Sequence, residues 1–155
     1  MGRQNMTSAT FPLTLRVNGI EHHVLVGADD TLLDVVRGQL RLYSCRETCG
    51  IGVCGSCTVR LDGRAVSACL TMAFTCRDAD VQTAEGGSAD RVQQAFIDHQ
   101  AFQCSFCTPG LVMSVAAMLD EPADGQDAEA ALSGHLCRCC SYQQIRSAVR
   151  ELFGS

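Results

Sequence analysis

Apolar and polar residues alternate along the first part of the chain, and this spacing later changes to that of helices. The alternation is clearest in FPLTLRVNGIEHHVLVG, residues 11–27, where it continues on both sides of Asn18-Gly19. Asn-Gly between two alternating segments is a strong signal for a tight hairpin turn. The sequence therefore predicts two antiparallel strands joined at this dipeptide.

The next sixty residues predict a mixed sheet with one helix across it. Residues 30–40 have apolar positions spaced as in an amphipathic helix, with Asp30 or Thr31 as its N-cap. TVRLDGRAVSACL, residues 58–70, predicts a second hairpin that turns at Asp62-Gly63. A short helical turn in residues 70–76 and a short strand in residues 80–86 complete this part, which we predict to be an α+β domain over 10–84.

Strand signals end after EGGSAD, residues 85–90, which is typical of a linker. The rest of the chain predicts four helical segments, at about 89–102, 109–120, 127–135 and 141–153. Thr108-Pro109 is a good helix start, and Ser141 with Gln144 matches a capping box. We therefore predict a second domain over 88–155, a small four-helix bundle.

Composition and charge exclude several classes of function. The chain has 155 residues with a net charge of −5, and its twelve basic residues are scattered, so nothing suggests a nucleic-acid-binding protein. No apolar run approaches the ~20 residues of a membrane span. The first residues, MGRQNMTSATF, lack the apolar core of a secretory signal, so we expect a cytoplasmic protein.

The cysteine content is unusual, with eleven in 155 residues. An odd number without a secretory signal argues against a disulfide framework. In a reducing compartment, clustered thiols more often bind metal or carry out redox chemistry. The spacing of the cysteines then decides which metal chemistry is expected.

One group of cysteines lies mainly in a single glycine-rich loop, CGIGVCGSC. Its members follow C-x4-C-x2-C-x11-C spacing and are Cys49, Cys54, Cys57 and Cys69. The first three match the plant-type [2Fe–2S] spacing, in which one loop wraps a cluster and a later cysteine completes it. Glycines allow such a loop positive φ angles and let backbone N–H groups approach the cluster. A zinc knuckle is the alternative, but zinc sites usually pair two C-x2-C units.

A second group consists of two cysteine pairs, each just before a predicted helix. These residues are Cys104, Cys107, Cys137 and Cys139. Helix N-termini offer unpaired N–H groups and a positive dipole end, which stabilise a negatively charged iron–sulfur centre. Spacing alone leaves iron and zinc both open at this second site.

Three motifs in order, CGIGVCGSCTVRLDGRAVSACL, QCSFCTPG and LSGHLCRC, resemble those of the iron–sulfur small subunit of molybdenum hydroxylases, the xanthine oxidase family. The resemblance covers nearly the whole chain. It implies a ferredoxin-like β-grasp domain with one [2Fe–2S] cluster, followed by a four-helix bundle with another. It also assigns iron to the second site.

The resemblance further implies a role in electron transfer, without catalysis by the chain alone. Electrons would pass from a molybdopterin centre on a large partner through two [2Fe–2S] clusters to FAD on another subunit or domain, in a heterotrimer or a dimer of heterotrimers. The substrate would be an N-heteroaromatic ring, an aldehyde or a similar small molecule. By resemblance, Gln103 and Cys139 lie closest to the pterin, and the first cluster lies on the flavin side.

Departures from the family pattern fall beside the expected clusters. They are Thr48, Ser105, His135, Cys140 and Ser141, and none removes an expected ligand. Three further cysteines, Cys45, Cys76 and Cys140, are expected to be spare thiols. A free-standing ferredoxin carrier and a zinc-stabilised interaction module are the alternative functions. The helical half argues against the first, because a simple carrier needs no second domain.

Overall fold

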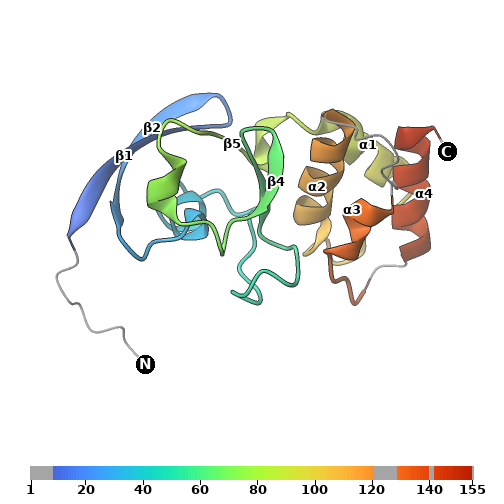
Figure 1. Cartoon of the computed structure of the whole chain (residues 1–155). Coiled ribbons are helices and arrows are strands. Elements are labelled where there is room, and N and C mark those ends of the chain that lie inside the picture. Colours follow the sequence, from blue (N-terminus) through green and yellow to red (C-terminus); the bar gives the residue numbers. More distant parts are fainter. Residues whose placement is uncertain (1–8, 121–128, 140–141, 155) are drawn as a thin grey trace.

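The computed structural model describes residues 9–120, 129–139 and 142–154. A β-sheet with short helices forms one half of the molecule and a group of α-helices the other (Figure 1). The strands are β1 Thr10–Val17, β2 Ile20–Gly27, β3 Thr58–Leu61, β4 Arg64–Ser67 and β5 Asp80–Gln82. The helices are η1 Asp34–Gln39, η2 Ala73–Cys76, η3 Ala84–Gly86, α1 Asp90–Asp98, α2 Thr108–Asp120, α3 Ala130–Ser133 and α4 Tyr142–Phe153.

The sheet contains both predicted hairpins. Its strand order is β2-β1-β5-β3-β4, and β5 runs parallel to β1 while the other neighbours are antiparallel. Both hairpin turns have two successive residues with positive φ, 52° and 81° at Asn18-Gly19 and 49° and 86° at Asp62-Gly63. These are the dihedral signs of a type I′ turn, which matches the twist of the strands. The predicted mixed sheet and both turn positions are confirmed.

The predicted helix after β2 is present, but it is wound more widely than expected. Thr31 caps it reciprocally: the Asp34 N–H donates to Thr31 Oγ1 at 3.2 Å, and the Thr31 N–H donates to Asp34 Oδ2 at 2.9 Å. Residues 34–39 then form a π-helix, in which the Leu40 N–H donates to the Val35 carbonyl at 3.0 Å. Apolar spacing predicts which face is buried but does not distinguish i→i+5 from i→i+4 hydrogen bonding.

The helical half differs from the prediction mainly in helix lengths. α1 ends at Asp98 rather than near 102, because Gln100 takes a left-handed φ of 50° that a helix cannot continue. α3 covers Ala130–Ser133 within the predicted segment 127–135, and part of that segment lies outside the described residues. The predicted cap Ser141 also lies outside them. No helix in the described part of the chain is long and apolar enough to cross a membrane.

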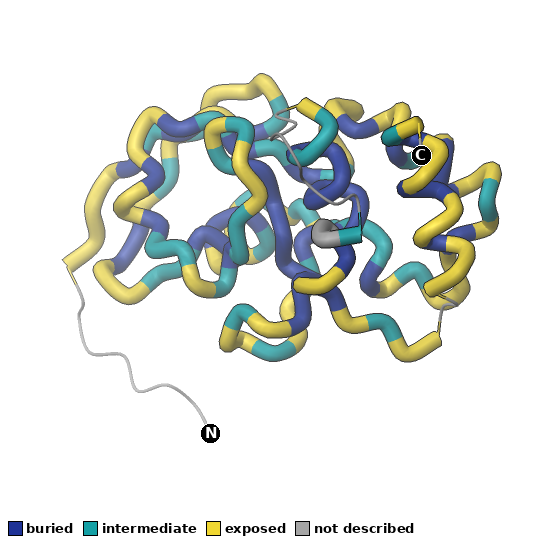
Figure 2. The backbone as a smooth tube through the Cα atoms, turned by 45° about the vertical axis from the view of Figure 1, so that its right-hand side comes forward, coloured by how far each residue is buried: buried dark blue, intermediate teal, exposed yellow. Residues whose placement is uncertain are grey.

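The molecule has two hydrophobic cores, and α2 belongs to the second. The first is built from the sheet, η1 and η2, and includes Leu15, Val36 and Val81; the second is built from the helices and includes Phe96, Leu111 and Ile145. α2 contacts β3 and β4 on one side and α1, α3 and α4 on the other, so residues 110–117 are all buried. Figure 2 shows buried backbone running through the middle of the molecule where the halves meet.

A charged pair also joins the two halves. Arg60 on β3 is only 6% exposed, and its guanidinium donates to the carboxylate of Asp120 at the end of α2. A buried guanidinium requires such a partner, because an unpaired charge away from water is costly. The two halves therefore pack closely, which brings the two cysteine loops into contact.

Candidate iron–sulfur sites

The first predicted group of cysteines lies in the loop between η1 and β3. Cys54 and Cys57 are buried, Cys49 is half-buried, and Cys69 follows β4 and is also half-buried. The loop's glycines, Gly50, Gly52 and Gly55, have φ angles of 66°, 76° and 70°. The prediction that this loop needs left-handed backbone is confirmed.

The thiols of this loop are arranged in pairs. The Cys49 side chain interacts with that of Cys54, and the Cys57 side chain with that of Cys69. The charge of Cys54 also acts to raise the pKa of Cys57, so the two pairs interact. Burial raises the pKa of the Cys57 thiol to about 11. The structure thus brings together the four cysteines that the sequence assigns to one site.

Backbone N–H groups of the loop are directed at a cysteine sulfur. The N–H of Ile51 has the largest effect, and with the Cys54 thiol and the N–H of Val53 it lowers the pKa of Cys49 to about 6. Inward amides of this kind form an anion-binding concavity. The loop is therefore suited to hold a negatively charged group.

The second group lies between α1 and α4, on two loops that precede helices. Cys107 is buried directly before α2, Cys137 is half-buried, and Cys104 and Cys139 are exposed. The N–H of Phe106 and, next, the Cys139 thiol lower the pKa of Cys104. The hydrogen bond with Cys104 and the charge of Cys104 raise the pKa of Cys139, and the charge of Cys137 acts in the same direction. Cys104, Cys137 and Cys139 are therefore near enough to interact with one another.

Two residues near the second site were not assigned a role from the sequence. The Tyr142 hydroxyl donates to the His135 carbonyl at 3.0 Å and accepts from the Cys137 N–H at 3.0 Å, so it fixes the loop before α4. The Arg46 guanidinium lies over the Phe106 ring, 5.2 Å from its centroid, and its charge helps to lower the pKa of Cys104. The motif CRCCSY contains this tyrosine, but the motif alone gives no indication of its contacts.

Two of the three cysteines predicted to be spare are buried in the first core. The Cys45 thiol donates to the Cys57 carbonyl at 3.4 Å, and the Cys76 thiol donates to the Met72 carbonyl at 3.7 Å. Burial raises the pKa of Cys45 to about 12 and also raises that of Cys76. Both contacts are those of neutral thiols, which supports the prediction. Cys140 lies outside the described residues.

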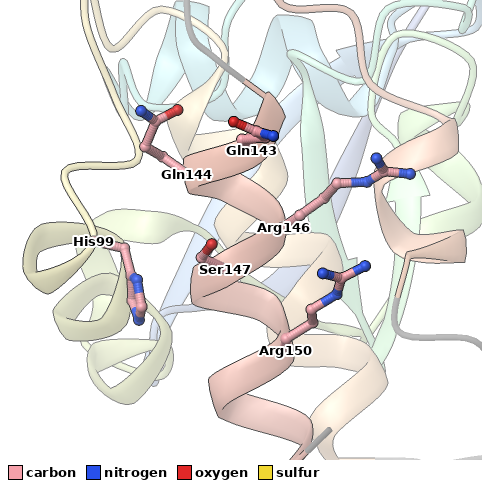
Figure 3. Close-up of a pocket in the computed structure, with 6 residues that line it drawn as sticks. All are labelled: His99, Gln143, Gln144, Arg146, Ser147 and Arg150. Carbon is pink, nitrogen blue, oxygen red and sulfur yellow. The ribbon is translucent and has the colours of Figure 1, made fainter.

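Gln103, predicted to face the pterin, is exposed and directly precedes the exposed Cys104. A separate surface cleft of about 350 Å³ lies against α4 and α1 (Figure 3). Its charges are satisfied within the chain: Arg146 and Arg150 both donate to Glu129, at 2.5 and 2.7 Å, and His99 pairs with Glu151 at 2.6 Å. The cleft is lined by His99, Gln143, Gln144, Arg146, Ser147 and Arg150.

The donor sets fit [2Fe–2S] clusters. Such a cluster is held by four cysteine thiolates, two on each iron, and in each site cysteine side chains lie near enough to interact with one another. Among residues 9–120, 129–139 and 142–154, no group of three or more His, Cys, Asp or Glu side chains is arranged to hold a single metal ion. A [2Fe–2S] core spreads its four ligands over two irons, so it does not need three ligands gathered around one point.

Comparison with known proteins identifies the family. Residues 17–103 match the model of a 2Fe-2S iron-sulfur cluster binding domain, and residues 80–150 match that of a [2Fe-2S] binding domain. The iron-sulfur-binding subunit of an aldehyde oxidoreductase from Escherichia coli is 38% identical, over 92% of this chain and 72% of its own length. The small subunit of nicotine 6-hydroxylase from Paenarthrobacter nicotinovorans is 40% identical, over 92% and 89%.

Solved structures agree with these relatives. Quinoline 2-oxidoreductase from Pseudomonas putida contains a chain that superimposes with a TM-score of 0.81 at 31% identity, covering 92% of this chain and 91% of that one. The aldehyde oxidoreductase of Desulfovibrio gigas gives 0.82 at 34% identity, but this chain covers only 17% of it. The chain belongs to the [2Fe–2S] iron–sulfur subunits of the molybdenum hydroxylases, the xanthine oxidase family. It is an electron-transfer subunit of an oxidoreductase complex, with the predicted α+β fold, and not a free-standing ferredoxin.

Proposed function

We propose that the chain carries electrons from a molybdopterin centre on a larger partner, through two [2Fe–2S] clusters, to FAD on a further subunit. The proposed first cluster is held by Cys49, Cys54, Cys57 and Cys69. The proposed second cluster is held by Cys104, Cys107, Cys137 and Cys139. Each cluster would supply one-electron storage, and the thiol pairs and inward N–H groups described above support these ligand sets.

We also propose two domains, 10–84 and 88–155. The separate hydrophobic cores support this division, since residues of the first core run from Leu13 to Val81 and those of the second from Ala89 to Leu152. Gly87, with a φ of 73°, lies between them. The free thiols support a location in a reducing compartment such as the cytoplasm.

One observation carries the proposed direction of transfer: two cysteines of the second site are exposed, whereas those of the first site are buried or half-buried. Cys104 and Cys139 lie at the surface beside Gln103, whereas Cys54 and Cys57 are 6% and 2% exposed. A partner's cofactor can approach the exposed pair closely, so we place the pterin there, with Gln103 and Cys139 nearest to it. The first site then passes electrons on to the flavin, in a heterotrimer or a dimer of heterotrimers.

The partner subunit selects the substrate in this proposal. The similar proteins are named for aldehydes, nicotine and quinoline, which supports an aldehyde or an N-heteroaromatic ring as the class. This chain contributes no residue to that choice, because its proposed role begins after the substrate has been oxidised.

Replacement of Gln103 by Ala in the purified complex tests the direction of transfer. We expect slower reduction of the second cluster by substrate, with an unchanged electron paramagnetic resonance (EPR) spectrum of the first. Gln144→Ala, a change at an exposed glutamine of α4, is the matched control. A disturbed first cluster together with normal reduction by substrate would mean that the order of the two sites is reversed.

A further inference from the structure

The two cysteine loops meet at a direct backbone contact. The Leu136 N–H donates to the Cys54 carbonyl at 3.1 Å. Cys54 is a proposed ligand of the first cluster, and Leu136 directly precedes Cys137, a proposed ligand of the second. A route of covalent bonds and one hydrogen bond therefore runs from the first set of ligands to the second.

Glycine makes this close contact possible. A Cβ atom at Gly55 would lie 2.4 Å from His135 Cδ2 and 2.6 Å from the Gly134 carbonyl oxygen. A Cβ atom at Gly110, in the first turn of α2, would lie 2.1 Å from the Gly55 carbonyl oxygen. Both elements that carry second-site cysteines thus pack directly on the first cysteine loop, with no room for a side chain between them.

His135 is the side chain that fills this junction. It is 5% exposed, and its Nε2 lies 3.3 Å from Ser114 Oγ on α2 and 3.5 Å from Thr58 Oγ1 on β3. The Thr58 hydroxyl already donates to the Gly55 carbonyl at 2.8 Å, so toward His135 it can only accept. A hydrogen bond to Thr58 therefore requires a proton on Nε2. The same N–H group can also donate to Ser114 Oγ.

We propose that His135 is a positioning residue for electron exchange between the two iron–sulfur sites. Its ring spans from α2 to β3 and holds the segment 134–136 against the first cysteine loop, which keeps the hydrogen bond between Leu136 and Cys54 in place. The exchange moves one electron: one site is oxidised and the other reduced, and no bond forms or breaks and no proton moves. This inference rests on the ligand sets proposed above.

The side-chain change that tests this role removes the donor and keeps the volume. His135→Leu fills the junction but cannot donate to Ser114 or Thr58, whereas His135→Gln keeps an N–H at similar reach. His22→Leu, the same change at a histidine on β2, is the matched control. Each variant is purified as the whole complex, and its iron content is measured first.

Exchange is then followed after a single electron is introduced by pulse radiolysis, from the transient absorbance of each cluster. We expect His135→Leu to slow the exchange roughly tenfold to a hundredfold, the usual effect of losing a group that supports a metal ligand. We expect His135→Gln and His22→Leu to stay near the wild-type rate. The spin–spin splitting in the EPR spectrum of the fully reduced protein should weaken only in His135→Leu, which gives a readout that does not depend on turnover.

Two variants at position 136 test the hydrogen bond between the Leu136 N–H and the Cys54 carbonyl. Leu136 is 61% exposed, so Leu136→Ala keeps the N–H at little cost, while Leu136→Pro removes it. Slow exchange in the proline variant and normal exchange in the alanine variant would support the proposal. Exchange at the wild-type rate in His135→Leu with full iron content would overturn the proposal. Loss of a cluster from that variant would also overturn it, because His135 would then maintain the fold and not the electron-transfer route. A wild-type chain without two clusters would instead refute the proposed function.

Discussion

The two cysteine loops share one local turn but differ in what surrounds it. In the first loop, the residue after Cys49 is Gly50, with a φ of 66°, and the N–H of the following residue is directed at the cysteine sulfur. In the second, the residue after Cys104 is Ser105, with a φ of 59°, and the corresponding N–H is again directed at the sulfur. Left-handed backbone after the first cysteine is therefore what aims the amide, and glycine only makes it easier.

The difference between the loops lies in their exposure. In the first loop Cys54 and Cys57 are buried, although Ile51 and Val53 near them are exposed, whereas Cys104 and Cys139 of the second loop lie at the surface. A buried site is shielded from solvent and oxidants, while an exposed site can be approached by a cofactor on another chain. The comparison shows that the two sites differ in the exposure of their cysteines and not in the type of ligand they offer.

The largest expected effect separates ligands from spare cysteines. Cys54→Ala should lose the first cluster and about half of the iron, because two thiolates are needed on each iron. The combined replacement of Cys45, Cys76 and Cys140 by Ala should keep the full iron content, since the first two donate to backbone carbonyls as neutral thiols. Iron analysis with EPR distinguishes these outcomes, and iron loss in the triple variant would show that our ligand assignment is wrong.

The next effect concerns the contact between the two halves. Asp120→Ala leaves the buried Arg60 guanidinium without its carboxylate partner. We expect the free energy of unfolding to fall by about 1–3 kcal/mol, the cost of an unsatisfied buried polar group. Urea denaturation measures it, with Glu47→Ala, a change at an exposed carboxylate, as the control. Equal stability of the two variants would mean that this ion pair does not hold the halves together.

A carboxylate beside the first loop should make stability depend on pH. Burial alone would raise the pKa of Glu85, but hydrogen bonds from Ser44 and Thr83 outweigh it and lower the pKa below the ordinary 4.5. A lowered folded-state pKa stabilises the protein above pH 4.5, and this stabilisation is lost as pH falls through the folded-state value. We expect Glu85→Gln to cost about 0.5–1.5 kcal/mol at neutral pH. The difference from wild type should shrink in acid, and a constant difference would contradict this prediction.

The smallest expected effect comes from exchanging the residue types at the two turns, Gly50 and Ser105. Ser105→Gly should relieve a left-handed serine and raise stability by about 0.5–1 kcal/mol, because only glycine takes this conformation without steric cost. Gly50→Ser should lower stability by a similar amount. The cause would be the left-handed φ and not a steric clash, since nothing lies within 4 Å of a Cβ atom built at Gly50. Thermal unfolding of both variants compares the two turns. We expect the two stability changes to have opposite signs. A loss of stability in both variants would mean that Ser105 makes a compensating contact.

The sequence was sufficient for features that depend on local chemistry. Asn18-Gly19 and Asp62-Gly63 were found because type I′ turns need residues that tolerate positive φ, and the loop glycines for the same reason. The left-handed Ser105, by contrast, carries no local signal. The contact of His135 with Thr58, 77 residues away, forms only when the two halves pack, and its contact with Ser114, 21 residues away, forms only when the helical half folds.

The metal content of the purified chain is the most direct measurement of the central claim. The account predicts about four irons and four acid-labile sulfides per chain, since each [2Fe–2S] cluster holds two of each. The reduced protein should also give two EPR signals, one from each cluster. Zinc as the main metal, or iron and sulfide for a single cluster, would contradict the account.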